Sequence, residues 1–224
     1  VENFRPGVLS KMGFGAEHLR EINPALIVGS VNGYGSTGPY VDRPSFDFIA
    51  QAMSGFMSLT GEIDGEPMRA APPMADLIAG LYCAFGIVSA IVARKRTGEG
   101  QYVEASLNNS LISLMAFLSA EYFATGKPPE RSGNNHAIVA PYGMFKAKDG
   151  AIAVAPSNET YAKRFLDAVG LTDLMEEDRF RTNADRMRNR QELLAIIDVA
   201  TEERTVDHWI ETINAAGCPC GRVM

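Results

Sequence analysis

Cysteine and histidine are scarce in this chain of 224 residues, which has three of each. Three cysteines are too few for a disulfide framework, and Cys218 and Cys220 form C-P-C rather than the C-x-x-C of redox and zinc sites. The scattered histidines offer no cluster of ligands for a metal ion. We therefore expect a reducing compartment, no disulfide and no bound metal.

Basic runs and long apolar stretches are also lacking. Lys and Arg number 21 against 27 Asp and Glu, so the formal charge is −6. Because nucleic-acid affinity depends on clustered cations, this balance argues against a nucleic-acid partner. The longest nearly uncharged apolar run, Leu77 to Ala93, is shorter than a usual membrane span and contains Gly80 and Gly86. It predicts a buried helix, and we expect no membrane partner.

The composition that is present is typical of a globular α/β protein, with 46% apolar and 21% charged residues. Residues 25 to 31 are a short β-rich apolar run, followed by a turn-rich loop from Asn32 to Pro39. Such a strand is typical of a buried parallel sheet. Because α/β folds place ligands at the carboxyl ends of their strands, this loop is a candidate binding segment.

The remaining pattern predicts two domains. Helical spacing is found over residues 10–22, 47–59, 77–95 and 108–125, with a strand over 101–105. A segment rich in glycine, proline and charge, 127–140, predicts a linker between domains 1–126 and 141–224. In the second domain, Asp149-Gly150 predicts a hairpin, and helices over 159–169, 191–200 and 206–215 complete a small α+β unit.

Asp76 lies between a proline-containing apolar segment and a wholly apolar helix. An uncompensated buried carboxylate is costly, so we expect the free N–H groups and positive dipole end of that helix to stabilise its charge. The pattern alone favours an ordinary N-cap, since Asp is a preferred residue there. A reactive carboxylate is the alternative that this position leaves open.

The turn Arg5-Pro6-Gly7 is a second candidate. Arg5 and Lys11 can bind phosphates, and Asn3 and Phe4 offer an amide and an aromatic face to a purine. A solvated turn beside an amphipathic helix explains the same residues.

Three further features have a plain structural interpretation. Asp47, after Phe46 at a helix start, favours a cap. Arg69 fits a loop cation or a carboxylate ligand, and the run from Arg179 to Arg190 indicates a charged helix face.

Several motifs together resemble the class III CoA-transferase family, which includes formyl-CoA transferase, carnitine CoA-transferase and the acyl-CoA racemases. The motifs are NFRPG, INPALIVGSVNGYGSTGPYVDRP, FDFIAQAMSGFMSLTG, MADLIAGLYCAFGI, RTGEGQYVEASL, PYGMFKAKDGAIAVAPSN and GCPCG, in the order of the family. The resemblance covers essentially all 224 residues. It implies a partial Rossmann-like large domain over 1–126 and an α+β domain over 141–224.

The resemblance also implies an activity and a set of site residues. Asp76 matches the family's nucleophile, which forms covalent aspartyl intermediates while CoA moves from an acyl-CoA to a carboxylic acid. Acyl-CoA is thus a substrate, and no permanently bound cofactor is expected. The family's contacts to CoA match Asn3, Phe4, Arg5, Val8, Lys11, Asn32 and Gly33.

Two positions separate the transferases from the racemases of the family. Racemases place a histidine where this chain has Phe46 and a glutamate where it has Asn158. Without them the chain lacks the second base that a two-sided proton transfer needs, so a transferase is preferred over a racemase or isomerase. The subgroup that looks most similar acts on dicarboxylic acids such as succinate and glutarate, with Phe46, Asp47 and Arg69 as candidate substrate residues.

The resemblance finally implies a larger parent protein. Family chains begin with a Rossmann-like half that nothing here matches, so we expect a fragment, and a catalytically inactive CoA-binding or dimerisation piece is a further alternative. Family members form interlocked homodimers, which we expect of the full-length form. The expected location is the cytoplasm, or the mitochondrion in a eukaryote.

Overall fold

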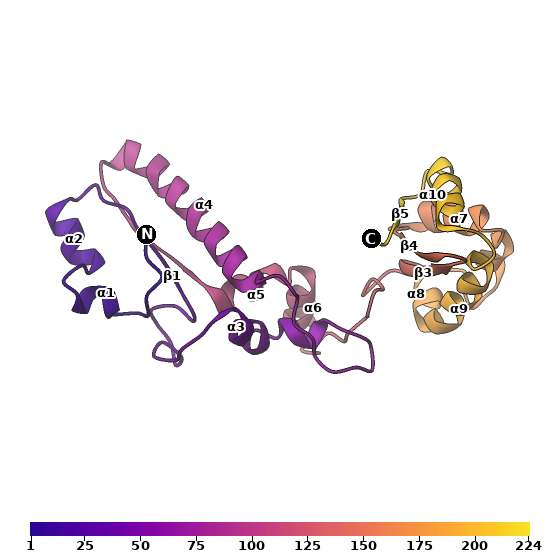
Figure 1. Ribbon diagram of the computed structural model, residues 1–224, viewed down its shortest axis with the longest axis horizontal. Helices are drawn as coiled ribbons and strands as arrows, with labels where there is room; N and C mark the ends of the chain where they lie inside the picture. Colours follow the sequence, from indigo (N-terminus) through magenta and orange to yellow (C-terminus); the bar gives the residue numbers. More distant parts are fainter. The chain divides into compact units, whose positions relative to one another are not determined.

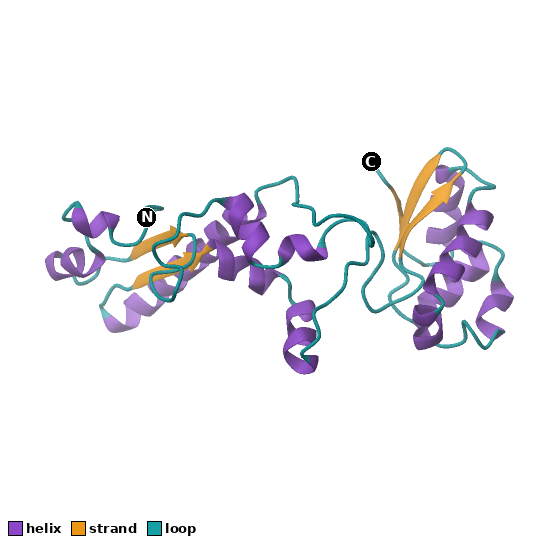
Figure 2. Ribbon diagram, turned by 90° about the horizontal axis from the view of Figure 1, so that it is seen from below, coloured by secondary structure: helices purple, strands orange, loops and turns teal.

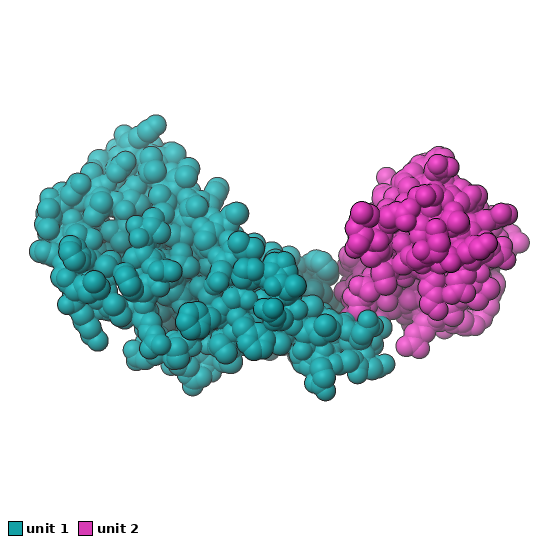
Figure 3. Space-filling model, viewed as in Figure 1, with its two compact units in different colours: residues 1–131 teal, residues 132–224 magenta.

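The computed structural model describes all 224 residues and divides them into two compact units, Val1–Arg131 and Ser132–Met224 (Figures 1 and 3). The division falls within residues 127–140, the segment in which the composition changes. The chain is mixed α/β, as the sequence predicts.

The elements of the first unit are α1 (Val8–Lys11), α2 (Ala16–Ile22), β1 (Val28–Asn32), α3 (Asp47–Met53), the 3-10 helix η1 (Phe56–Leu59), α4 (Met74–Thr97), β2 (Tyr102–Ser106), α5 (Leu107–Leu114) and α6 (Phe117–Thr125). Those of the second unit are β3 (Gly143–Ala147), β4 (Gly150–Val154), α7 (Glu159–Ala168), the 3-10 helix η2 (Thr172–Glu176), α8 (Asn183–Arg188), α9 (Arg190–Thr201), α10 (Val206–Ala215) and β5 (Cys220–Arg222).

Strands β1 and β2 form a parallel pair, with Val28 opposite Tyr102 and Asn32 opposite Ser106. Helix α4 connects back to β2 and packs on this pair. A Cβ added at Gly86 would lie 2.6 Å from Cγ1 of Val103, so the close packing of helix on strand requires glycine there. Both strands therefore end at the same edge of the pair, where the loops after Asn32 and Ser106 begin.

Helix α4 is far less buried than the sequence predicts. Of its 24 residues only Ala75, Ala79, Cys83 and Ala90 are buried. Phe85 is 73% exposed, and Leu77, Leu81, Val88 and Val92 are also exposed. By length and composition the helix would be able to cross a membrane, a test that core helices of soluble proteins pass as well. The prediction of a buried helix is therefore wrong for most of its side chains, because α4 contacts β1, β2, α3 and α5 with only part of its surface.

Three helices that the spacing predicts as continuous are interrupted in the structure. The backbone takes positive φ at Gly13, between α1 and α2, and at Gly55, between α3 and η1. Ala116, between α5 and α6, has a φ of 47°. Such residues leave the right-handed helical region, which apolar periodicity alone does not reveal.

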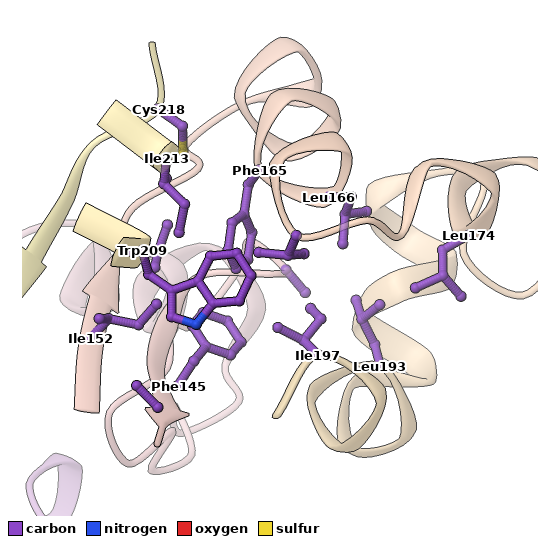
Figure 4. Close-up of a cluster of buried hydrophobic side chains, with 14 of the residues drawn as sticks. Phe145, Ile152, Phe165, Leu166, Leu174, Leu193, Ile197, Trp209, Ile213 and Cys218 are labelled. Atoms are coloured by element: carbon purple, nitrogen blue, oxygen red, sulfur yellow. The ribbon is translucent and has the colours of Figure 1, made fainter. Parts of the chain in front are cut away.

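The second unit is an antiparallel sheet in the order β3-β4-β5, with helices on one face (Figure 2). The predicted hairpin at Asp149-Gly150 is confirmed, with Ala147 opposite Gly150. Side chains along β3 and β4 alternate between the core and solvent. Phe145, Ile152, Phe165 and Trp209 meet in the core shown in Figure 4. The indole N–H of Trp209 donates to the carbonyl of Thr201 at 2.7 Å.

Arg186 corrects the interpretation of residues 179–190 as a charged surface. Its side chain is 1% exposed. Its guanidinium donates to the carbonyl oxygens of Ala140, Phe180 and Arg181 and to a carboxylate oxygen of Glu159 at 2.7 Å. A buried cation whose three guanidinium nitrogens all donate to protein acceptors is a structural centre of this unit.

Candidate active site

Asp76 is the third residue of α4, which begins at Met74, three residues earlier than the sequence predicts. Pro73 occupies the N-cap position, so the prediction of an Asp76 N-cap is wrong. The exposed carboxylate of Asp76 accepts no hydrogen bond and forms no ion pair, and its backbone N–H donates to no protein acceptor. The residue thus presents an unoccupied carboxylate and an unoccupied donor at the positive end of a long helix.

Asp47 performs the capping that Asp76 does not. It is buried at the start of α3, where its own helix has no side-chain cap. Its Oδ1 accepts the backbone N–H of Ala75 at 2.8 Å, across 28 residues of sequence, and its Oδ2 accepts Nε2 of Gln51 at 2.7 Å. The prediction that Asp47 caps its own helix is therefore wrong: its carboxylate holds the start of α4 instead.

Gln51 extends this contact toward the loop before α4. It is fully buried, and its Oε1 accepts the backbone N–H of Ala70 at 2.9 Å. Sequence reasoning missed Gln51, although its spacing four residues after Asp47 places both side chains on one face of a helix. Asp47 and Gln51 together fix the two ends of the segment from Ala70 to Ala75 that leads into Asp76.

The environment raises the pKa of Asp76 above its ordinary value of 3.8. Partial burial is the main cause, and the negative charge of Asp47 adds to it. A carboxylate with a raised pKa is a stronger base when it is ionised. The geometry around Asp76 therefore favours a nucleophile over a salt-bridge partner.

Asp76 opens onto a cleft of 440 Å³ in the first unit. The cleft is lined by residues from five separate segments of the chain: Asn3, Phe4, Arg5, Pro6, Val31, Asn32, Gly33, Tyr34, Val41, Arg43, Ser45, Phe46, Asp76 and Leu107. Five of the seven positions that the resemblance assigns to CoA thus lie with the candidate nucleophile. Val8 and Lys11, on and at the end of α1, do not line it.

Of the three predicted substrate residues, only Phe46 lines the cleft. Phe46 is 80% exposed, while Asp47, the next residue, is buried and does not line the cleft. Arg69 is exposed on the loop between η1 and α4 and does not line the cleft. Asn158, in the second unit, caps α7 by accepting the N–H of Tyr161 at 3.0 Å.

The loop after β1 is shaped by a carboxylate that the sequence analysis did not single out. Asn32 donates to Oε1 of Glu104 at 2.7 Å and accepts the N–H of Gly35 at 2.6 Å. The other oxygen of Glu104 accepts the backbone N–H and the hydroxyl of Ser36. The buried amide of Asn32 is therefore used to hold the loop in place.

Gly33 lets this loop approach the segment before α3. A Cβ at Gly33 would lie 2.5 Å from the Cβ of Ser45, closer than side chains can pack. Both residues line the cleft, so this contact forms part of its wall.

A second cavity of 760 Å³ adjoins the segment around Arg5. Arg5 and Pro6 line both cavities. The second cavity also contains Arg20, whose Nε is buried with no hydrogen-bond partner. A ligand longer than the Asp76 cleft therefore has a continuation past Arg5.

The whole chain, residues 1–224, matches the model of CoA-transferase family III, and the protein belongs to this family. It is 39% identical to an acetyl-CoA:oxalate CoA-transferase from Acetobacter aceti over 100% of this chain and 58% of that protein. It is 35% identical to a human succinyl-CoA:glutarate CoA-transferase over 100% of this chain and 51% of that protein.

Among solved structures, a CAIB/BAIF family protein from Brucella suis has a TM-score of 0.83 and 37% identity, covering 100% of this chain and 59% of that chain. The chain thus spans a little over half the length of the relatives it matches.

Proposed function

We propose that the protein of which this chain is part transfers CoA from an acyl-CoA to a carboxylic acid, with Asp76 as the covalent nucleophile. The observation that carries the proposal is the unpartnered Asp76 carboxylate at the edge of a cleft that also contains Asn3, Phe4 and Arg5. Membership of CoA-transferase family III supports the reaction class.

The first half of the reaction forms an aspartyl-CoA thioester. The Asp76 carboxylate attacks the thioester carbonyl carbon of the donor, the C–S bond breaks, and CoA leaves as the thiolate. The thiolate then attacks the aspartyl carbonyl of the resulting anhydride and releases the donor's carboxylate. In the second half the acceptor carboxylate displaces CoA from Asp76, and the thiolate attacks the acceptor's acyl carbon, which frees Asp76.

The N–H of Asp76 is the proposed donor to the oxyanions of these steps. It is the one backbone N–H in the first turn of α4 that has no protein acceptor, because Asp47 takes the N–H of Ala75 and Pro73 takes that of Leu77. Donors that are fixed before the reaction stabilise developing negative charge without reorganisation.

Dicarboxylic acids are the proposed substrate class. The relatives from Acetobacter and human are named for oxalate and glutarate, and others for citramalate and mesaconate. Each of these acids carries a second carboxylate that does not react. This pattern supports a dicarboxylate as donor, acceptor or both.

A transfer assay tests the proposal. Succinyl-CoA is incubated with glutarate or oxalate, and the new thioester is separated by liquid chromatography. We expect transfer that Asp76→Asn abolishes while the circular dichroism spectrum is retained. Transfer that survives in Asp76→Asn would refute the role of this carboxylate.

The same samples in deuterium oxide distinguish transfer from racemisation. Transfer leaves the hydrogens on the carbon next to the thioester in place, so no deuterium is expected there. Incorporation of deuterium that depends on Asp76 would instead indicate an acyl-CoA racemase.

A further inference from the structure

Arg43 lines the same cleft as Asp76, and its guanidinium forms no ion pair or hydrogen bond with the protein. Only its backbone N–H is engaged, donating to the carbonyl of Tyr40 at 2.9 Å. A charged side chain in a cleft, with its donors unpaired, is available to a ligand that carries negative charge.

The guanidinium of Arg43 stacks on the ring of Tyr40, which packs in turn against the ring of Tyr34. Its central carbon lies 3.9 Å from the centre of the Tyr40 ring, and the Tyr40 ring meets the ring of Tyr34 edge to face at 5.5 Å. Stacking uses the flat face of the guanidinium and leaves the N–H groups in its plane free. Those in-plane groups are the ones that grip a carboxylate through two parallel hydrogen bonds.

The charges around the cleft show why such a group is needed. A second carboxylate entering beside Asp76, with Asp47 buried nearby, meets repulsion unless a cation compensates. Arg5 and Arg43 are the two cations that line the cleft. Arg5 also lines the adjoining cavity and belongs to the segment assigned to CoA, which leaves Arg43 for the carboxylate that does not react.

We propose that Arg43, stacked on Tyr40, binds the distal carboxylate of a dicarboxylic substrate and so selects dicarboxylates over monocarboxylates. This inference rests on the proposed function and adds the residue that determines its specificity. It also replaces Arg69 in that role, because Arg69 lies outside the cleft lining.

The test compares glutarate with pentanoate, which has a methyl group in place of one carboxylate. The variants are Arg43→Met, Arg43→Lys, Arg69→Met and, as a matched control, Arg96→Met, an exposed arginine at the other end of α4. The ratio of kcat/KM for glutarate to that for pentanoate should fall about 10- to 100-fold in Arg43→Met, the loss expected for hydrogen bonds to a charged group. Arg43→Lys should give a smaller fall in this ratio, since lysine keeps the positive charge but cannot form two parallel hydrogen bonds to a carboxylate.

Equal losses for both acids in Arg43→Met would overturn the proposal, as would a change of the ratio in Arg69→Met instead. Arg96→Met should leave the ratio within about twofold.

Binding measured without turnover separates this inference from the proposed function. Saturation-transfer NMR of glutarate, in the presence of CoA, should show a contact that Arg43→Met removes and Arg96→Met retains. If glutarate binds through Arg43 but no CoA is transferred, the proposed function fails and the specificity site stands. If CoA is transferred but glutarate binds equally well to the wild type and to Arg43→Met, the role of Arg43 is refuted and the proposed function stands.

Discussion

The carboxylate of Asp47 accepts the backbone N–H of Ala75 at 2.8 Å, one residue before Asp76. Through this contact a residue of α3 caps the start of α4. The side chain of Asp76 is therefore not needed as a cap and makes no hydrogen bond with the protein. The carboxylate of Asp47 also raises the pKa of Asp76 by charge repulsion, second to partial burial. Asp47 is therefore a positioning residue for the proposed nucleophile, since it acts on Asp76 through the backbone and through charge.

Asp47→Asn should destabilise the first unit by about 1–3 kcal/mol, because the new amide has to point one N–H group at an existing donor, either Gln51 Nε2 or the N–H of Ala75. Urea denaturation followed by circular dichroism measures this loss. Asp42→Asn, on the exposed loop before α3, is the matched control and should have little effect.

Asp47→Asn should also move the acid limb of the kcat/KM profile to lower pH. Removal of the negative charge lowers the pKa of Asp76 toward its ordinary value of 3.8, so the reactive carboxylate is present in more acidic solution. In the wild type the raised pKa gives a stabilisation that is complete below 3.8 and is lost as the pH rises through the folded-state pKa. An acid limb that stays in place would contradict the electrostatic role of Asp47.

Gly33→Ala should lower kcat/KM for acyl-CoA about 10- to 100-fold, because its Cβ would lie 2.5 Å from the Cβ of Ser45 and displace the cleft wall. Gly80→Ala is the control: an added Cβ there meets nothing within 4 Å and should stabilise α4 by about 1 kcal/mol. Wild-type kcat/KM in Gly33→Ala would show that the contact between Gly33 and Ser45 is not needed for acyl-CoA to react.

The sequence predicts the elements of this fold better than the contacts between them. Asp76 stands out because a carboxylate beside an apolar helix is conspicuous, and α10 matches its expected bounds of 206 and 215. The contacts of Glu104 with Asn32 and Ser36, and of Gln51 with Ala70, do not stand out, because they join residues 19 to 72 positions apart. The role of Arg43 cannot be predicted from the sequence either, because it depends on the stacking of its guanidinium on Tyr40 in the folded loop.

Arg186→Met should destabilise the second unit by about 3 kcal/mol or more, because the carbonyls of Ala140, Phe180 and Arg181 would lose their donors. Fluorescence of the single tryptophan, Trp209, reports on this unit during urea unfolding. Arg188→Met, which removes an exposed ion pair with Asp185, should cost less than about 1 kcal/mol. Equal costs for the two variants would contradict the structural role of Arg186.

The thiols of Cys218 and Cys220 should react slowly with iodoacetamide in the folded protein. Burial raises the pKa of each to about 11, so little thiolate is present at neutral pH. The stabilisation from these neutral thiols is complete below 9.0 and is lost as the pH rises toward about 11. Labelling followed by peptide mass spectrometry, with the urea-unfolded chain as reference, measures the difference. Equal rates in the two states would show that neither thiol is protected.

The most direct test of the account is to trap the covalent intermediate on Asp76. The protein is incubated with succinyl-CoA and hydroxylamine, and its intact mass and peptides are compared with those of Asp76→Ala. Hydroxylamine attacks an activated aspartyl group and leaves a hydroxamate, whereas a free carboxylate does not react. The account predicts a hydroxamate on Asp76 that is absent from the variant. Turnover of the thioester by the wild type with no hydroxamate on Asp76, or a hydroxamate on another residue, would contradict it.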